Sequence, residues 1–249
     1  MKPFKRWLGL AVAAVLALQL FFIVRIASMA VVAPQSTAFE RSEAWRILNE
    51  KGKLPWRQQW VAYPQISDNL KRAVIASEDD GFAYHDGVDW DALEKAWQKN
   101  AKAEAQVAKL APSKKSGTAV AKPARAPKVV GGSTITQQLA KNLFLSGERT
   151  LLRKGQEFVL TMLLEALLSK ERILEIYLNS VEWGEGVFGA EAAAQHYFRK
   201  PASRLTAYEA ARLAVMLPRP KYFEKLSNSS YLSERAGVIA GRLVNAELP

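Results

Sequence analysis

A long apolar run near the N-terminus constrains this chain more than any other feature. From Trp7 to Val24 the residues are almost wholly apolar, and only Gln19 interrupts them. As a helix this run would be about 27 Å long, which is close to the hydrocarbon thickness of a bilayer. A cleaved signal peptide has a shorter apolar region, of about 7–15 residues. We therefore predict a membrane-spanning signal anchor over residues 1–33, with cleavage near Ala27-Ser28-Met29-Ala30 as the open alternative.

The formal net charge of +11 is concentrated in two parts of the chain. Residues 1–38 carry Lys2, Lys5, Arg6 and Arg25 and no acid, and residues 98–130 carry eight basic residues against Glu104 alone. The rest of the chain is electrically balanced. Basic residues before the apolar run predict a cytoplasmic N-terminus, so that the chain after residue 33 lies beyond the membrane. No nucleic-acid partner is expected.

Cysteine and histidine usage excludes two kinds of site. The chain has no cysteine, so it can form neither a disulfide nor a thiolate metal site. Its two histidines, His85 and His196, are far apart in the sequence. A zinc site is therefore not expected.

The chain after the anchor divides into a juxtamembrane segment, residues 34–63, and a folded domain, residues 64–249. Trp45, Trp56 and Trp60 of the first segment suit either the membrane interface or packing on the domain. Apolar residues at helical spacing predict a mainly α domain, with helices over residues 68–77, 151–168, 173–178, 190–197 and 206–216. Residues 98–130 have little to bury and are interpreted as a mobile basic insertion. This insertion is either an arm for phosphate groups or an inert surface loop.

A glycine pair precedes a helix whose polar side chains share one face. Gly131 and Gly132 are followed by Ser-Thr-Ile-Thr-Gln-Gln-Leu-Ala-Lys-Asn. At about 100° per residue, Thr134, Gln138 and Lys141 fall on a single stripe. Free N–H groups and the helix dipole favour an anion at such a helix start. The sequence therefore predicts an anion site here, and a capped amphipathic helix with a solvated polar face is the alternative.

An acidic turn follows the helix predicted over residues 68–77. It begins Glu78-Asp79-Asp80, and acids at a helix C-terminus oppose the helix dipole. The same surroundings raise the pKa of a glutamate and make it a better base near neutral pH. Glu78 is thus a candidate base, against a solvated acidic turn or a divalent-ion loop.

Glu157 lies on a predicted helix, with Arg153 and Lys154 one turn before it. Ion pairing on a solvated face would explain this spacing. The other interpretation is a second active-site carboxylate held by cations. Enzymes that act at the anomeric carbon of a sugar usually use two carboxylates.

These segments together resemble family-51 glycosyltransferases, the peptidoglycan polymerases. The resemblance implies a lysozyme-like, mostly helical catalytic domain with a small membrane-associated lobe, preceded by one transmembrane helix. Five blocks carry it: Glu78-Asp79 with Phe82, His85 and Gly87; Gly131 through Asn142; Arg153-Lys154 with Glu157; Lys170 with Ile173-Leu174-Glu175 and Tyr177-Leu178-Asn179; and Leu205-Thr206 through Leu217-Pro218.

The reaction implied by the resemblance joins disaccharide units carried on undecaprenyl pyrophosphate (lipid II) into β-1,4-linked glycan strands. Glu78 would be the general base, and Glu157 would orient the substrate or assist the leaving group. Lys141, Arg149 and Arg153 would stabilise the pyrophosphate, alone or with Mg²⁺, and no other cofactor is expected. The remaining substrate-binding residues implied are Asp79, Phe82, His85, Thr134, Gln138, Asn142 and Lys154.

The resemblance also implies a place and partners for the protein. It would be a single-pass protein of the cell inner membrane with a periplasmic catalytic domain. Its partners would be lipid II, the growing lipid-linked glycan, and penicillin-binding and divisome proteins, which would perform the cross-linking. Two alternatives stay open: a lysozyme-like lytic enzyme, and a non-catalytic membrane-anchored scaffold of the cell wall.

Overall fold

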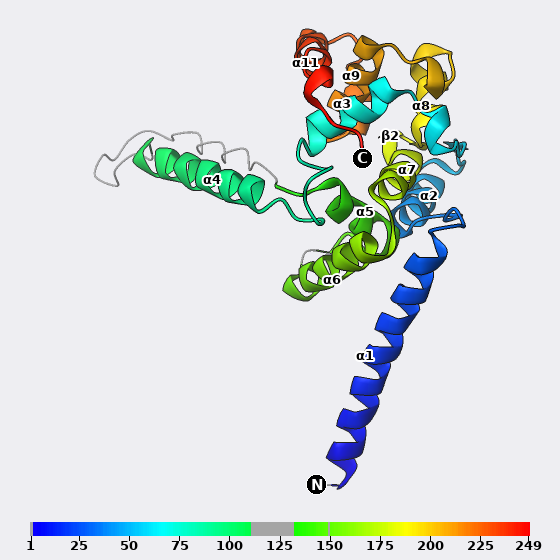
Figure 1. Cartoon of the computed structure of the whole chain (residues 1–249), viewed down its shortest axis with the longest axis vertical. Helices are drawn as coiled ribbons and strands as arrows, with labels where there is room; N and C mark the ends of the chain where they lie inside the picture. Colours follow the sequence, from blue (N-terminus) through cyan, green and yellow to red (C-terminus); the bar gives the residue numbers. More distant parts are fainter. Residues whose placement is uncertain (1, 111–131, 149) are drawn as a thin grey trace. The chain divides into compact units, whose positions relative to one another are not determined.

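The computed structural model describes residues 2–110, 132–148 and 150–249. Its first element, helix α1 (Lys2–Ser28), is drawn in blue in Figure 1. From Pro3 to Ser28 this helix is long and apolar enough to cross a membrane, and the protein buries only 6% of its apolar window. This finding agrees with the predicted anchor. The end of α1 is fixed to the domain, because Arg172 Nε donates a hydrogen bond to the carbonyl oxygen of Met29 at 2.7 Å.

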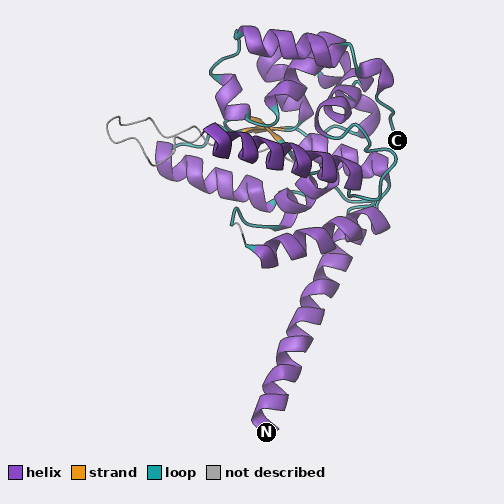
Figure 2. Ribbon diagram, turned by 90° about the vertical axis from the view of Figure 1, so that its left-hand side faces the viewer, coloured by secondary structure: helices purple, strands orange, loops and turns teal. Residues whose placement is uncertain are grey.

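The domain after α1 is mainly helical, as predicted, and its small sheet lies among the helices (Figure 2). Strand β3 lies between β1, to which it is parallel, and β2, to which it is antiparallel. The helices are α2 (Ala38–Lys51), α3 (Asp68–Glu78), α4 (Trp90–Leu110), α5 (Ile135–Phe144), α6 (Leu151–Leu167), α7 (Lys170–Ser180), α8 (Ala190–Phe198), α9 (Ala207–Met216), α10 (Pro220–Glu224) and α11 (Ser230–Ala240). The shorter elements are β1 (Arg57–Gln58), β2 (Glu182–Gly184), β3 (Val187–Phe188) and the 3₁₀ turns at Tyr63–Gln65, Ala202–Arg204 and Leu243–Asn245.

Hydroxyl side chains set where most of these helices begin. Thr37, Thr134 and Thr206 each accept a hydrogen bond from the backbone N–H three residues later, where a Glu or Gln returns the bond. This capping box satisfies two N–H groups that a helix leaves without partners. Four of the five predicted helix starts agree with the structure to within one residue, whereas α7 begins at Lys170, three residues before the predicted 173.

Contacts divide the chain into two compact units, residues 1–87 with 134–249, and residues 88–133. In the first unit α3, α9 and α11 pack together, and α5 packs against both α6 and α7. The largest fully buried side chains include Trp183, Tyr177 and Phe82. The second unit contains α4, which continues to Leu110.

The basic tract therefore differs from the expected loop in its first part, because residues 98–110 are helical. Alanine, lysine and glutamine are strong helix formers, and they dominate this stretch. Residues 111–130 of the tract lie outside the described residues.

Two of the three juxtamembrane tryptophans pack on the domain. The ring of Trp56 stacks on Phe188 with centroids 4.5 Å apart, and Trp60 Nε1 donates to Glu175 at 3.2 Å. Trp45 is 68% exposed. Of the two interpretations, packing on the domain holds for Trp56 and Trp60, and Trp45 remains suited to an interface.

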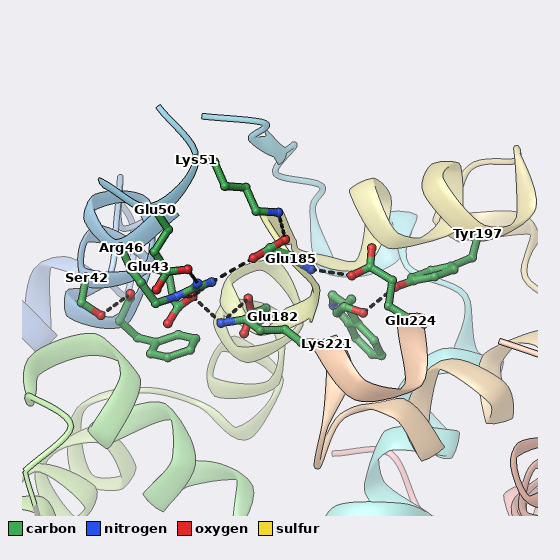
Figure 3. Close-up of polar contacts among 12 residues, drawn as sticks. Ser42, Glu43, Arg46, Glu50, Lys51, Glu182, Glu185, Tyr197, Lys221 and Glu224 are labelled. Carbon is green, nitrogen blue, oxygen red and sulfur yellow. Dashed lines mark hydrogen bonds and ion pairs between the residues drawn. The ribbon is translucent and has the colours of Figure 1, made fainter. Parts of the chain in front are cut away.

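A polar cluster joins α2 to β2 and α10 (Figure 3). Lys221 lies between two carboxylates, in contact with Glu43 and 3.4 Å from Oε1 of Glu182. Glu182 is buried, and this burial raises the pKa of its carboxyl to about 7, with Glu43 acting in the same direction and Lys221 opposing it.

This cluster predicts a pH-dependent stability. An acid whose pKa is higher in the folded chain than in the unfolded chain stabilises the fold at low pH and loses that contribution as pH rises. Glu182→Gln should therefore come close to the native chain at pH 4, below the unfolded pKa, and exceed it in free energy of unfolding at pH 8 by on the order of 3 kcal/mol. Denaturation at both pH values measures this difference. A less stable variant at pH 8 would mean that the Lys221 ion pair outweighs the cost of burial.

Candidate active site

The candidate base, Glu78, is the last residue of α3 and lies beside α5. Gln138 Nε2 donates to Oε2 of Glu78 at 3.0 Å, and Oε1 of the same amide accepts from the hydroxyl of Tyr177 at 3.0 Å. Tyr177 is fully buried on α7. The resulting relay fixes the orientation of the Gln138 amide, and with it the carboxylate. The sequence analysis gave Tyr177 no individual role. Its position on the apolar face of the predicted helix was a signal, because a hydroxyl buried there needs a hydrogen-bond partner.

The surroundings of Glu78 raise the pKa of its carboxyl. Burial is the largest cause, and the charge of Asp79 adds to it. The hydrogen bond from Gln138 and the charge of Lys141 act in the opposite direction. The predicted shift has the expected sign, but its main cause is loss of water and not the neighbouring acids. A carboxylate with a raised pKa is a stronger base once it is ionised.

Asp79 does not face the same space as Glu78. It is buried, and its Oδ2 accepts the backbone N–H of Ile135 at 2.9 Å, at the start of α5. Its Oδ1 lies 2.8 Å from Nε2 of His85. Since the Gly87 N–H donates to Nδ1 of His85 at 3.1 Å, Nε2 carries the ring proton and donates to Asp79.

The anion site predicted at the start of α5 is therefore corrected. The anion that the helix N-terminus attracts is the chain's own Asp79 carboxylate, which leaves no place for a phosphate at that N–H. Thr134 of the predicted stripe does not reach the surface with Lys141, because it is 3% exposed and its hydroxyl donates to the Gly87 carbonyl oxygen at 2.6 Å. The positive φ of Gly87, 85°, permits this turn.

Phe82 likewise supports the site from within the core. Its ring is fully buried, so a direct substrate contact is excluded in this conformation. The ammonium of Lys170 lies 4.6 Å from the ring centroid, contacts the carbonyl oxygen of His85, and pairs with Glu165 at 2.9 Å. Lys170, named in the fourth block without a role, thus fixes the turn that follows Glu78.

A second carboxylate, Glu157, lies on α6 among cations. It is 4% exposed, and it pairs with Arg153 at 3.0 Å and contacts Lys154. Its burial does not fit the solvated face of the simpler interpretation. The Nε atom of Arg153 is buried and has no hydrogen-bond partner among the described residues.

Lys141 connects the two carboxylates electrostatically. It extends from α5 to the surface, yet partial loss of water around its ammonium lowers its pKa. Arg153 and Lys154 add to this lowering, whereas Glu157 and Glu78 oppose it. The charge of Lys141 therefore acts on both carboxylates. Asn142 is half-buried on the same helix, and Arg149 lies outside the described residues.

The described residues hold no group of three His, Cys, Asp or Glu side chains that could bind a metal ion. Two carboxylates near three cations suit an anionic ligand better than a dedicated metal site.

Comparison with known proteins places this geometry in a family. A family model described as transglycosylase matches residues 47–108 and 113–244. The chain belongs to the transglycosylase family. A biosynthetic peptidoglycan transglycosylase of Burkholderia thailandensis is 54% identical over 248 residues, which cover 98% of this chain and 88% of that protein. Proteins of the same description from Burkholderia pseudomallei and Burkholderia multivorans are 54% and 52% identical, each over 98% of this chain and over 88% and 92% of their own lengths.

Membership of the transglycosylase family confirms the resemblance drawn from the five sequence blocks. All five blocks lie within the two matched segments, residues 47–108 and 113–244. The chain is therefore a transglycosylase enzyme with a mainly helical catalytic domain. The roles of its individual site residues stay predictions.

Proposed function

We propose that this transglycosylase polymerises lipid II into β-1,4-linked glycan strands and releases undecaprenyl pyrophosphate. The relatives' description as biosynthetic peptidoglycan transglycosylases supports this assignment. The observation that carries it is the position of Lys141, whose charge acts on the candidate base Glu78 and also on Glu157, the ion-pair partner of Arg153. Such a site can accept a proton at one end and neutralise a phosphate leaving group at the other.

In the proposed reaction Glu78 takes the proton of the acceptor's sugar 4-hydroxyl. The hydroxyl oxygen then attacks C1 of the donor sugar, and the bond from C1 to the pyrophosphate oxygen breaks. Attack from the face opposite to the leaving group inverts C1 from α to β. Lys141 and the guanidinium group of Arg153 stabilise the charge that develops on the pyrophosphate.

Glu157 is proposed to act through the cations and not as a second base. Its carboxylate holds Arg153 and Lys154 on one side of α6. A cation that is already oriented needs no reorganisation when the leaving group becomes charged. His85 and Asp79 position the start of α5, and Gln138 positions Glu78, so these three are positioning residues.

The lytic alternative differs in what its site must bind. A lysozyme-like acid needs no group of cations for a pyrophosphate, and here three cations surround Glu157. Incubation of the purified full chain with lipid II in detergent should yield polymer and free undecaprenyl pyrophosphate. Incubation with finished glycan should leave its length unchanged. Shortened glycan without polymer would establish the lytic function, and no reaction with either substrate would favour the scaffold.

The location proposed for the enzyme rests on α1 and on its contact with α6. Gln19, within the apolar part of α1, exchanges hydrogen bonds with Gln156 of α6 at 3.2 and 3.3 Å. Near that contact Leu151 and Leu152 are 93% and 87% exposed, as expected of side chains that face lipid. We propose a single-pass inner-membrane protein with a cytoplasmic N-terminus and a periplasmic catalytic domain. Penicillin-binding and divisome proteins are its proposed partners.

A further inference from the structure

A cavity of about 370 Å³ opens where α1 meets the domain. Its walls come from the last turns of α1, the segment before α2, and the ends of α2 and α5 that face them. Phe21 and Phe22 of α1 and Leu143 and Phe144 of α5 provide its apolar side. Phe22 and Phe144 meet edge to face, with ring centroids 5.4 Å apart. A cavity of this size is in the range of small-molecule sites, about 300–1,000 Å³.

The polar side of the cavity carries two guanidinium groups, and none of the described residues that line it is acidic. Arg41 donates to the hydroxyl and carbonyl oxygens of Ser36 at 3.0 and 3.2 Å. Its charge acts on the neighbouring Glu40, but among the described residues no carboxylate forms an ion pair with it. The Arg25 guanidinium has no ion-pair or hydrogen-bond partner within the described parts of the chain. Two arginines that form no ion pair with a described carboxylate favour an anion, and their planar N–H groups match phosphate oxygens in particular.

The position of the cavity along α1 narrows the source of that phosphate. Arg25 precedes the end of the apolar helix at Ser28 by one turn, which places its charge at the level of lipid headgroups once α1 is inserted. Phe21 lies one further turn toward the middle of the helix and is 58% exposed. Cations at headgroup level above exposed aromatic surface match a phosphate attached to an acyl chain.

The cavity is separate from the catalytic residues. Glu78, Gln138, Lys141 and Glu157 do not line it. Leu143, which does, lies about 200° around α5 from Lys141 and therefore faces another side of that helix. The structure gives no reason to assign this cavity to the reacting pyrophosphate.

We propose that this junction cavity binds the headgroup of an anionic phospholipid, with its phosphodiester held by Arg25 and Arg41. The bound lipid would fill the space between α1 and α5 and stiffen the connection between the anchor and the catalytic domain. This assignment rests on insertion of α1 into the membrane, and it does not depend on the reaction assigned above.

Native mass spectrometry of the full chain in neutral detergent tests the proposal. Phosphatidylglycerol should remain bound to the native chain, and phosphatidylcholine should not. Arg25→Gln with Arg41→Gln should weaken retention of phosphatidylglycerol by about tenfold or more. Lys5→Gln with Arg6→Gln, which removes the same charge at the other end of α1, is the matched control and should change little. Arg25→Lys with Arg41→Lys should give an intermediate result and guards against a folding defect.

Several results would overturn the assignment. Equal losses in the two glutamine pairs would show general attraction to anionic lipid, and equal retention of phosphatidylcholine would exclude the phosphate contact. Full competition by water-soluble glycerol phosphate would indicate a site for free phosphate. One-for-one displacement by lipid II would make the cavity part of the substrate site. Polymerisation by the Arg25→Gln, Arg41→Gln variant in detergent should persist, which separates this test from that of the proposed function.

Discussion

Glu78→Gln is expected to reduce polymerisation of lipid II by about a hundredfold to ten-thousandfold, the range attributed to general base catalysis. The amide cannot accept the proton of the attacking hydroxyl. Its oxygen can still accept the hydrogen bond from Gln138, so the relay to Tyr177 should survive. Burial already disfavours the charged carboxylate, so the variant should be at least as stable as the native chain above neutral pH.

The measurement is the initial rate of glycan formation from lipid II, with thermal unfolding of the same preparation. Asp80→Asn is the control, because Asp80 is the exposed neighbour of the acidic pair and belongs to no part of the relay. A Glu78→Gln enzyme that polymerises at the native rate would contradict the assignment of Glu78 as base.

Asp79→Ala should have the largest effect on stability among the site residues. It removes the acceptor of two buried donors, the N–H of Ile135 and Nε2–H of His85. An unsatisfied buried donor costs about 1–3 kcal/mol, so the free energy of unfolding should fall by about 2–5 kcal/mol. The start of α5 would also lose the charge that favours its dipole. Activity should fall as well, since Gln138 is carried by that helix.

Chemical denaturation of Asp79→Ala and of Asp79→Asn distinguishes this account from a general effect of substitution. The asparagine oxygen can still accept from Ile135, but its amide N–H₂ opposes the N–H of His85. We therefore expect Asp79→Asn to lose about half as much stability as Asp79→Ala. An alanine variant as stable as the native chain would show that Asp79 does not fix α5.

Local rules predicted the helices well because their signals lie within a few residues. The predicted helix over residues 68–77 ends one residue short of α3, and that over 206–216 differs from α9 only by its capping Thr206. The strands were not predicted, because β1 and β3 have two residues each and pair across more than a hundred positions. Such short segments carry no periodicity.

The site was predicted in its residue types and less well in its contacts. Glu78 was named from the acidic turn and Glu157 from its spacing to Arg153 and Lys154, whereas the roles of Lys141 and Arg149 came from the resemblance. Asp79 accepts the N–H of Ile135 at the start of α5. These two residues are 56 positions apart, and no local sequence pattern indicates such a hydrogen bond. The same holds for Tyr177, whose partner Gln138 is 39 positions away. Burial decides the pKa of Glu78, and burial follows from how the helices pack together.

The hydrogen bonds between Gln19 and Gln156 have a consequence for how the enzyme meets its substrate. Gln19 lies nine residues before the end of α1, about 14 Å along the helix, and Gln156 is the neighbour of Glu157. With α1 inserted, the start of α6, which carries Glu157, lies at the depth of the lipid layer. Donor and acceptor can then reach the site by lateral diffusion without leaving the bilayer. The encounter is two-dimensional, and the quantity that sets its frequency is the mole fraction of substrate among the surrounding lipids, not its concentration in the bulk solution.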